Sequence, residues 1–331
     1  MKGSSTRLRL DVRRKSTRLL QSRATGSLRV IEKPTAESYR QSAIAELGFE
    51  TSQLAERAYQ FNMRAAHQSA LSSPELGQIT ARLRSMPDRY APGRDHLLFY
   101  PAIPQELSLL IKPFASTVDK LYRSNILYNR QYPELPTEGG IEPRQFYEKI
   151  EDLLRTRLVC KYMDGPRFVC EDLKQFCDQN GIQSKFRELS TSAGYYAWHF
   201  YVQVSVELML DTQVVPKGVW VEIQISTQLA EVLTALTHEL YEARRSSGAG
   251  PKNNDWKWDA SSRDFRSAYL GHGLHLIEGV IQNLKDDLLQ QSPAKHDEST
   301  PQLTKPSSSF EKQPSVGSDA PKPSSDDGKK V

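Results

Sequence analysis

The sequence predicts an α+β fold, with a mixed β-sheet of about five strands flanked by helices. Between residues 150 and 245, short runs of β-branched and aromatic residues alternate with helical patterns, whereas residues 36–75 are helical throughout. Hydrophobic residues make up 38% of the 331-residue chain. That share supports a packed core but is low for a chain ordered from end to end, so we expect disordered segments.

The two ends have the composition of such segments. Residues 1–30 hold nine Lys or Arg and one acid, which gives this part a charge of +8 against −4 for the rest. Residues 291–331 are mostly Pro, Ser, Lys and Asp and cannot bury enough surface to offset their ordering entropy. We therefore expect a basic disordered arm over 1–35 and a disordered tail over 291–331. For the arm, an organelle transit peptide and an RNA-contacting segment stay open as alternatives.

A helical N-terminal segment is expected over 36–104. Apolar residues recur at three- and four-residue steps up to residue 75, with Gly48 as a point where the helix can divide, and Ser72 to Pro74 end it. The Pro-rich stretch 85–104 should be irregular, with Leu97, Leu98 and Phe99 buried.

The remaining elements are predicted from the period of about 3.6 residues in helices and of two residues in strands. Pro and Gly over 131–145 indicate a loop, and Gly181 is placed to end a helix. Residues 105–245 should form the main domain, followed over 246–290 by a loop and a C-terminal helix. We expect strands at 153–162, 198–210 and 219–225, and helices at 104–130, 168–179, 227–245 and 264–290.

The predicted strand 219–225 carries a carboxylate at its centre. Strict alternation sends four β-branched residues to one face and places Glu222 and Gln224 on the other, beside Trp220. A carboxylate in the middle of a strand is costly unless it is paired or binds a metal. An edge strand with a solvated face would explain this segment equally well.

A second carboxylate, Asp152, stands at the start of the strand 153–162, with Arg155 expected on the opposite face. If both strands belong to one sheet, Asp152 and Glu222 can lie side by side. Two such carboxylates are a common way to hold Mg²⁺ for phosphate chemistry. Because they repel each other without metal, alanine at either position should leave the fold largely stable.

The loop before the strand 198–210 offers an aromatic ring. Gly194 and Tyr195 follow the small polar residues Ser190 to Ala193, whereas Trp198 and Phe200 read as core. A flexible loop that ends in an aromatic residue can place its ring over a nucleobase, and Tyr195 is the candidate.

Taken in order, these motifs resemble the synthetase domain of RelA/SpoT proteins, the alarmone synthetases. Asp152-Leu-Leu-Arg-Thr-Arg157 is similar to the family's Asp-Leu-x-Gly-x-Arg strand, and Gly194-Tyr195-x-x-x-His199 to its Gly-Tyr-x-Ser-x-His loop. The run Val221–Thr227 contains Glu222–Thr227, which is similar to the family's Glu-Ile-Gln-Ile-Arg-Thr strand. A helix with His238-x-x-Tyr241 follows, as a helix with His and Tyr does in the family. The match covers about residues 108–245 and implies a nucleotidyltransferase-like fold.

The resemblance implies transfer of pyrophosphate from ATP to the 3′-hydroxyl of GDP or GTP, with Mg²⁺ as cofactor. Asp152 and Glu222 would be the catalytic carboxylates and metal ligands, and Tyr195 would stack on the acceptor nucleoside. A Lys-x-x-x-Ser-x-x-x-Lys helix in the family lends cations to ATP phosphates. The implied nucleotide-binding residues besides Tyr195 are Arg157, His199, Gln224, Lys112, Ser116, Lys120, Arg123 and His238.

Three residues depart from the family pattern: Arg155 replaces the glycine, Ser226 the arginine and Ala197 the serine. Two alternatives therefore stay open, pyrophosphorylation of the tRNA 3′ end and a catalytically inactive domain that senses nucleotide or RNA. Nothing before residue 105 supplies the His and His-Asp metal ligands of the family's hydrolase domain, so we predict no hydrolase activity.

The three cysteines, Cys160, Cys170 and Cys177, form no CxxC pair, so we expect buried, reduced thiols and no zinc site. No apolar run approaches the roughly 20 residues of a membrane span, and no secretory signal is evident. The sequence therefore predicts an intracellular, cytoplasmic protein with no membrane partner. Organelle targeting by residues 1–30 and a homo-oligomer stay open.

Overall fold

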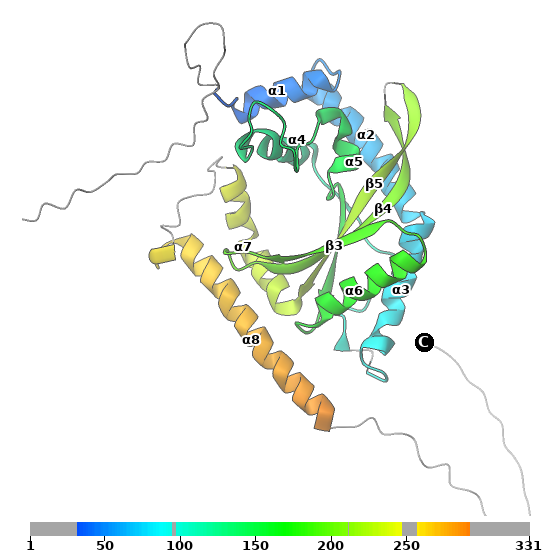
Figure 1. Ribbon diagram of the computed structural model, residues 1–331, viewed down its shortest axis with the longest axis vertical. Helices are drawn as coiled ribbons and strands as arrows, with labels where there is room; N and C mark the ends of the chain where they lie inside the picture. Colours follow the sequence, from blue (N-terminus) through cyan, green and yellow to red (C-terminus); the bar gives the residue numbers. More distant parts are fainter. Residues whose placement is uncertain (1–31, 95–96, 211, 247–256, 292–331) are drawn as a thin grey trace, which may run out of the picture. The chain divides into compact units, whose positions relative to one another are not determined.

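A five-stranded mixed sheet forms the centre of the computed structural model, which describes residues 32–94, 97–210, 212–246 and 257–291 (Figure 1). Most of the predicted basic arm and all but the first residue of the predicted tail lie outside these residues. Within them, no helix combines the length and the apolar character needed to cross a membrane.

The sheet has the order β1-β2-β5-β4-β3. Only β2 and β5 run parallel, and the other neighbours are antiparallel, which confirms the predicted mixed sheet. The strands are β1 (Leu110–Ile111), β2 (Leu154–Cys160), β3 (Ser184–Ser190), β4 (Tyr196–Leu210) and β5 (Gln213–Thr227).

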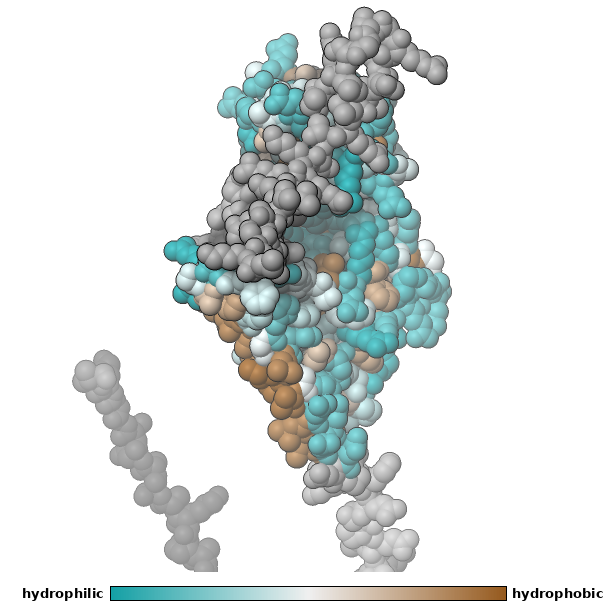
Figure 2. Space-filling model, turned by 60° about the vertical axis from the view of Figure 1, so that its left-hand side comes forward, coloured by the Kyte–Doolittle hydropathy of each residue, from teal (hydrophilic) through white to brown (hydrophobic). Residues whose placement is uncertain are grey.

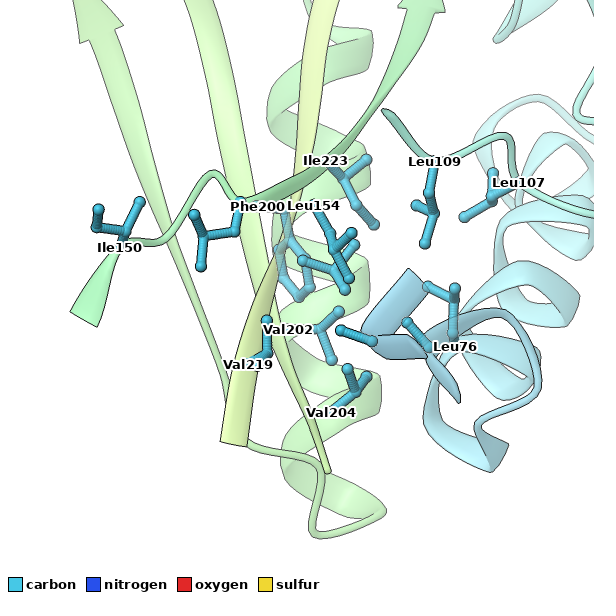
Figure 3. Close-up of a cluster of buried hydrophobic side chains, with 14 of the residues drawn as sticks. Leu76, Leu107, Leu109, Ile150, Leu154, Phe200, Val202, Val204, Val219 and Ile223 are labelled. Carbon is cyan, nitrogen blue, oxygen red and sulfur yellow. The ribbon is translucent and has the colours of Figure 1, made fainter. Parts of the chain in front are cut away.

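The register of β2 against β5 separates an apolar face from a polar face. Leu154 pairs with Val221, and all four predicted core residues of β5 are fully buried. On the other face, Arg155 pairs with Glu222 and Arg157 with Gln224. Figure 3 shows side chains of the apolar face, among them Val202 and Ile223, packed toward Leu76 and toward Leu107 and Leu109, which precede β1. The alternation predicted for 219–225 is therefore confirmed.

Helices cover both faces. Contacts with β4 place α2 (Ser52–Leu71), α3 (Pro74–Tyr90) and α6 (Gly165–Gln179) on the apolar side, so the helical N-terminal segment packs on the sheet. Helices α7 (Gln228–Ser246) and α8 (Arg263–Gln291) lie on the polar side (Figure 1). The smaller helices are α1 (Ala36–Glu46), α4 (Phe114–Tyr122), α5 (Phe146–Lys149), a π-helix at Arg123–Leu127 and a 3₁₀ turn at Pro143–Gln145.

Three local predictions were wrong. Pro74 begins α3, capped by Ser73, so the chain is helical to Tyr90 where irregular structure was expected. The helix expected from residue 104 starts only at Phe114, because β1 precedes it. Strand β3 was not predicted, since its polar, partly exposed residues give no clear apolar alternation.

Other local predictions are confirmed. Gly48 separates α1 from α2 with a φ of 84°, which favours glycine. Leu98 and Phe99 are buried, whereas Leu97 is only half-buried. The three cysteine thiols are buried and free, and burial raises the pKa of each.

Candidate functional site

A pocket of about 360 Å³ lies between the polar face of the sheet and helices α7 and α8. Its size is that of a small-molecule site. Seven of the residues predicted from sequence line it: Asp152, Glu222, Tyr195, Arg157, His199, Gln224 and Lys112. The fold therefore brings together residues that are up to 112 positions apart in the chain.

Asp152 lies in the turn before β2 and binds two lysines. Lys112 Nζ is 2.8 Å from one carboxylate oxygen, and Lys120 Nζ is 2.7 Å from the other. Although burial opposes ionisation of Asp152, the ammonium groups of Lys120 and Lys112 hold its pKa well below the usual range. The carboxylate is thus charged at neutral pH and largely neutralised by its neighbours.

Lys112 is fixed by its backbone. Its N–H donates to the carbonyl of Leu153 (2.8 Å), and its own carbonyl accepts from the Tyr59 hydroxyl (2.6 Å). Only 3% of the residue is exposed, and burial lowers its pKa while Asp152 limits that shift. Lys112 precedes α4 and so does not lie on a helix, although a helix was predicted over 104–130, yet both lysines meet at Asp152.

Glu222 is held by His199 and Gln224. Glu222 is 4% exposed, His199 Nδ1 lies 2.8 Å from one carboxylate oxygen, and Gln224 Nε2 donates to the other (2.7 Å). A carboxylate can only accept, so His199 Nδ1 donates to Glu222. The other ring nitrogen, Nε2, lies 3.1 Å from the Tyr195 hydroxyl. Tyr195, His199, Glu222 and Gln224 form one hydrogen-bonded chain along the pocket wall.

Two arginines of β2 face the pocket, which corrects the expectation that Asp152 and Arg155 point to opposite faces. Asp152 lies in the preceding turn, where the two-residue period does not apply. Arg157 Nη1 pairs with Glu231 of α7 at 3.0 Å, and Ser226 donates weakly to the same carboxylate (3.4 Å). Arg155, by contrast, makes no hydrogen bond or ion pair with any residue of the described ranges.

Arg123, Ser116 and Lys120, also predicted to bind nucleotide, do not line the pocket. Arg123 forms an ion pair with Asp119. Ser116 lies on α4, and Lys120 reaches the site only through Asp152. The side chain of His238 lies outside the described residues, although its backbone belongs to α7.

Helix α8 closes the pocket through a contact that requires two glycines. Gly194, with a φ of 76°, ends the turn before Tyr195. A Cβ on Gly194 would lie 2.3 Å from the carbonyl oxygen of Ala268, and one on Gly271 would lie 2.2 Å from that of Gly194. Side chains at either position would drive α8 and the turn apart.

Aromatic contacts reinforce the closure. The rings of Tyr196 and His275 stack with centroids 3.7 Å apart and an interplanar angle of 5°. The Tyr196 hydroxyl is 2.7 Å from His272 Nδ1, and His272 Nε2 is 3.3 Å from the carbonyl of Ser192. Because that carbonyl must accept, His272 Nε2 donates to it.

The second half of α8 is anchored by charged groups. Glu278 accepts a hydrogen bond from Thr227 at the end of β5 and lines the pocket. Lys285 is 8% exposed and binds Asp164 (2.8 Å) and the Tyr90 hydroxyl (2.7 Å). Sequence reasoning missed the contribution of α8, although His272, His275 and Glu278 recur at three-residue steps and so share a helical face.

The donor set suits a magnesium ion. Mg²⁺ binds few carboxylates and completes its octahedron with water and substrate phosphates. Asp152 and Glu222 both line the pocket, and each carboxylate has about four acceptor positions, so its present hydrogen bonds leave room for a metal. The described residues contain no group of three or more His, Cys, Asp or Glu side chains placed to hold a metal by themselves.

Comparisons with known proteins give only distant matches. No protein-family model and no curated protein sequence matches the chain. The small alarmone synthetase 1 of Bacillus subtilis matches with 18% identity and a TM-score of 0.43 over 71% of this chain and 97% of its own. Its structure bound to its product pppGpp matches with 16% identity and a TM-score of 0.41 over 71% and 99%.

A GTP pyrophosphokinase family protein from Streptococcus pneumoniae matches with 14% identity and a TM-score of 0.37, over 72% of this chain and 98% of its own. The sequence motifs described above resemble the same family. At these TM-scores the matches carry no functional assignment, which depends on the residues of the pocket.

Proposed function

We propose that this chain transfers pyrophosphate from ATP to the 3′-hydroxyl of GDP or GTP, in a reaction that depends on Mg²⁺. The observation that supports it most directly is the composition of one pocket. The buried carboxylate of Glu222 and the partly buried carboxylate of Asp152 line it together with Lys112, Arg155 and the ring of Tyr195. A triphosphate donor needs cations and a metal site, and a nucleoside acceptor needs a ring to stack on.

The residues suit distinct steps of this reaction. The 3′-oxygen of the acceptor attacks the β-phosphorus of ATP, the bond from that phosphorus to the oxygen bridging to the α-phosphate breaks, and AMP leaves. Glu222 would accept the hydroxyl proton, and its hydrogen bonds to His199 and Gln224 would hold its carboxylate in one orientation. Bound Mg²⁺, held by Asp152 and Glu222, would neutralise charge on the triphosphate.

Arg155 offers a cation that the family pattern does not have. The family's arginine on the β5 strand is Ser226 here, and Ser226 contacts Glu231. Arg155 stands on the adjacent strand, opposite Glu222 in the register, and has no carboxylate partner within the described residues. We propose that Arg155 contacts the triphosphate in place of the arginine missing at position 226.

A label-transfer assay tests the proposal and its alternatives together. The full chain is incubated with Mg²⁺ and ATP labelled in the γ-phosphate, with GDP, GTP or tRNA as acceptor. We expect the label to appear in guanosine tetra- or pentaphosphate, with an equal amount of AMP. Label on the tRNA 3′ end would replace the acceptor in this proposal. Nucleotide binding without AMP formation would indicate an inactive sensor domain.

A further inference from the structure

Two carboxylates stand next to each other in the turn between α5 and β2, and they bind groups toward opposite edges of the sheet. Asp152 binds two lysines that follow β1 in the chain. Glu151 binds Lys185 and Arg187 of β3, the strand at the other edge. The reaction proposed above uses Asp152 and gives no role to Glu151.

The contacts of Glu151 have a defined geometry. Arg187 donates to its two carboxylate oxygens from Nη1 and Nη2, at 2.8 Å each, and Lys185 Nζ lies 2.6 Å from one of them. A fork of this kind fixes the orientation of a carboxylate as well as its position. Although burial opposes ionisation of Glu151, the hydrogen bonds from Lys185 and Arg187 lower its pKa, so the group is charged at neutral pH.

The exposure of Glu151 sets it apart from ordinary surface ion pairs. The face of the molecule drawn in Figure 2 carries many hydrophilic residues, and ion pairs on such a surface contribute little. The side chain of Glu151, by contrast, is only 19% exposed. Solvent and salt therefore screen its contacts less than those of an exposed pair.

Aromatic rings hold the two cations in place. Lys185 Nζ lies 4.2 Å from the ring centroid of Trp220, and Arg187 Cζ lies 5.4 Å from that of Tyr201. Trp220 and Tyr201 are 8% and 5% exposed, so packing fixes both rings. Trp220 belongs to β5, and β4 lies between β5 and β3, so Lys185 extends across the sheet. Glu151 is thus bound by fixed groups and not by mobile surface side chains.

These contacts hold the turn on the side of the sheet where Glu222 stands. In the strand order β1-β2-β5-β4-β3, the lysines attract Asp152 toward β1, whereas Glu222 lies on β5, on the other side of β2. The ion pairs of Glu151 attract the same turn toward β3, which lies beyond β5. The two sets of contacts together fix the place of Asp152 between the two edges.

We propose that Glu151 is a positioning residue for the metal: through Lys185 and Arg187 it holds Asp152 where the carboxylates of Asp152 and Glu222 can bind one magnesium ion. This inference rests on the proposed function, which gives the metal its role. Neither Glu151 nor its two partners line the pocket, so they act through Asp152. Replacing a group that orients a metal ligand typically changes metal affinity by roughly 10- to 100-fold.

Binding of Mn²⁺ alone to the full chain, followed by the electron paramagnetic resonance signal of the free ion, tests this role without turnover. Mn²⁺ stands in for Mg²⁺ because it takes the same oxygen ligands in an octahedral site. We expect Glu151→Gln to raise the dissociation constant of Mn²⁺ by roughly 10- to 100-fold and Arg187→Gln to raise it as well. The double variant should resemble Glu151→Gln, since both substitutions remove the same contact.

Arg187→Gln separates positioning from a simple effect of charge. Loss of a nearby negative charge weakens the binding of a cation, whereas loss of a nearby positive charge strengthens it. Only a positioning role makes Glu151→Gln and Arg187→Gln act in the same direction. The matched control is Glu148→Gln, the same substitution three positions earlier, which breaks the ion pair with Lys217 (3.0 Å). It should keep the wild-type affinity, and circular dichroism checks that every variant is folded.

Two results would overturn this inference and leave the proposed function intact. Tighter binding of Mn²⁺ by Arg187→Gln would show that Glu151 acts only by its charge. Unchanged affinity in Glu151→Gln would show that the fully buried neighbours Ile150 and Leu153 hold the turn without it. A wild type that binds no Mn²⁺ would instead overturn the metal site of the proposed function, and this inference with it.

Discussion

Asp152 and Glu222 are both largely buried and line one pocket, yet their partners differ in charge. Asp152 binds the ammonium groups of Lys112 and Lys120, whereas Glu222 binds His199 and Gln224. In the first group the negative charge is locally neutralised by two lysines, and removing it leaves the buried ammonium of Lys112 without a carboxylate. In the second group the charge remains, ready to attract a metal or a proton. Two carboxylates that line the same pocket can therefore differ in how much they contribute to folding stability and how much to catalysis.

Replacing each carboxylate by alanine measures its contribution to catalysis and its contribution to stability. Both Asp152→Ala and Glu222→Ala should reduce pyrophosphate transfer by at least about 10³-fold, as expected when a group essential to the transition state is lost. Their stabilities should differ. Asp152→Ala leaves the ammonium of Lys112 buried without a carboxylate and should lower the free energy of unfolding by on the order of 3 kcal/mol.

Glu222→Ala leaves the donors of His199 and Gln224 without this acceptor and should cost about 1 kcal/mol. Denaturant unfolding and the label-transfer assay measure the two effects separately. The paired lysines thus revise the sequence-based expectation that alanine at Asp152 leaves the fold largely stable. Equal losses of stability in the two variants would contradict the predicted difference between Asp152 and Glu222. Wild-type turnover in both variants would show that neither residue takes part in the reaction.

The same contrast applies to the two arginines of β2. Arg157 pairs with Glu231, whereas Arg155 has no partner within the described ranges. A charge-assisted hydrogen bond contributes about 1.5–3 kcal/mol, so Arg155→Ala should weaken ATP binding by roughly 10- to 100-fold. Arg157→Ala is the matched control and should have a smaller effect, because Glu231 already offsets that charge. Isothermal titration calorimetry with a non-hydrolysable ATP analogue measures the affinity of each variant. A larger loss of affinity with Arg157→Ala would contradict the proposed role of Arg155.

Sequence reasoning succeeded where a pattern is local. The alternation of Val219 to Ile225 places Glu222 on the polar face without any knowledge of the partner strand. The motif that contains Asp152 likewise places that carboxylate beside a strand. These are properties of a few consecutive residues, so a single sequence suffices to predict them.

It failed where the deciding contact is distant in the chain. Lys112 and Lys120 reach Asp152 because β1 pairs with β2, and a two-residue strand leaves no periodic signal. Helix α8 reaches the pocket because Gly271 packs on Gly194, a contact between residues 77 positions apart. The apolar residues of α8 also suggest an inward side that in fact faces outward, since the usual rule assumes that a helix buries its apolar face in its own chain.

The smallest predicted effect is a pH dependence that belongs to Asp152. The pKa of this carboxyl is depressed in the folded chain, because Lys120 and Lys112 outweigh the effect of burial. A group with a depressed folded pKa contributes stability that is present above its unfolded value and is lost as the pH falls toward the folded value. The unfolded value is 3.8, so wild type should be more stable than Asp152→Asn by a constant margin from pH 7 to 5.

Below pH 4 the difference in free energy of unfolding between wild type and Asp152→Asn should decrease, by about 1 kcal/mol at pH 3. Each pH unit below the unfolded pKa reduces this difference by about 1.36 kcal/mol. Urea unfolding of the two proteins at pH 7, 5 and 3 measures it, and comparing differences between the proteins cancels the titration of all other carboxyls. A margin that stays constant to pH 3 would show that the two lysines do not depress this pKa. The conclusion that Lys112 and Lys120 neutralise the charge of Asp152 would then be wrong.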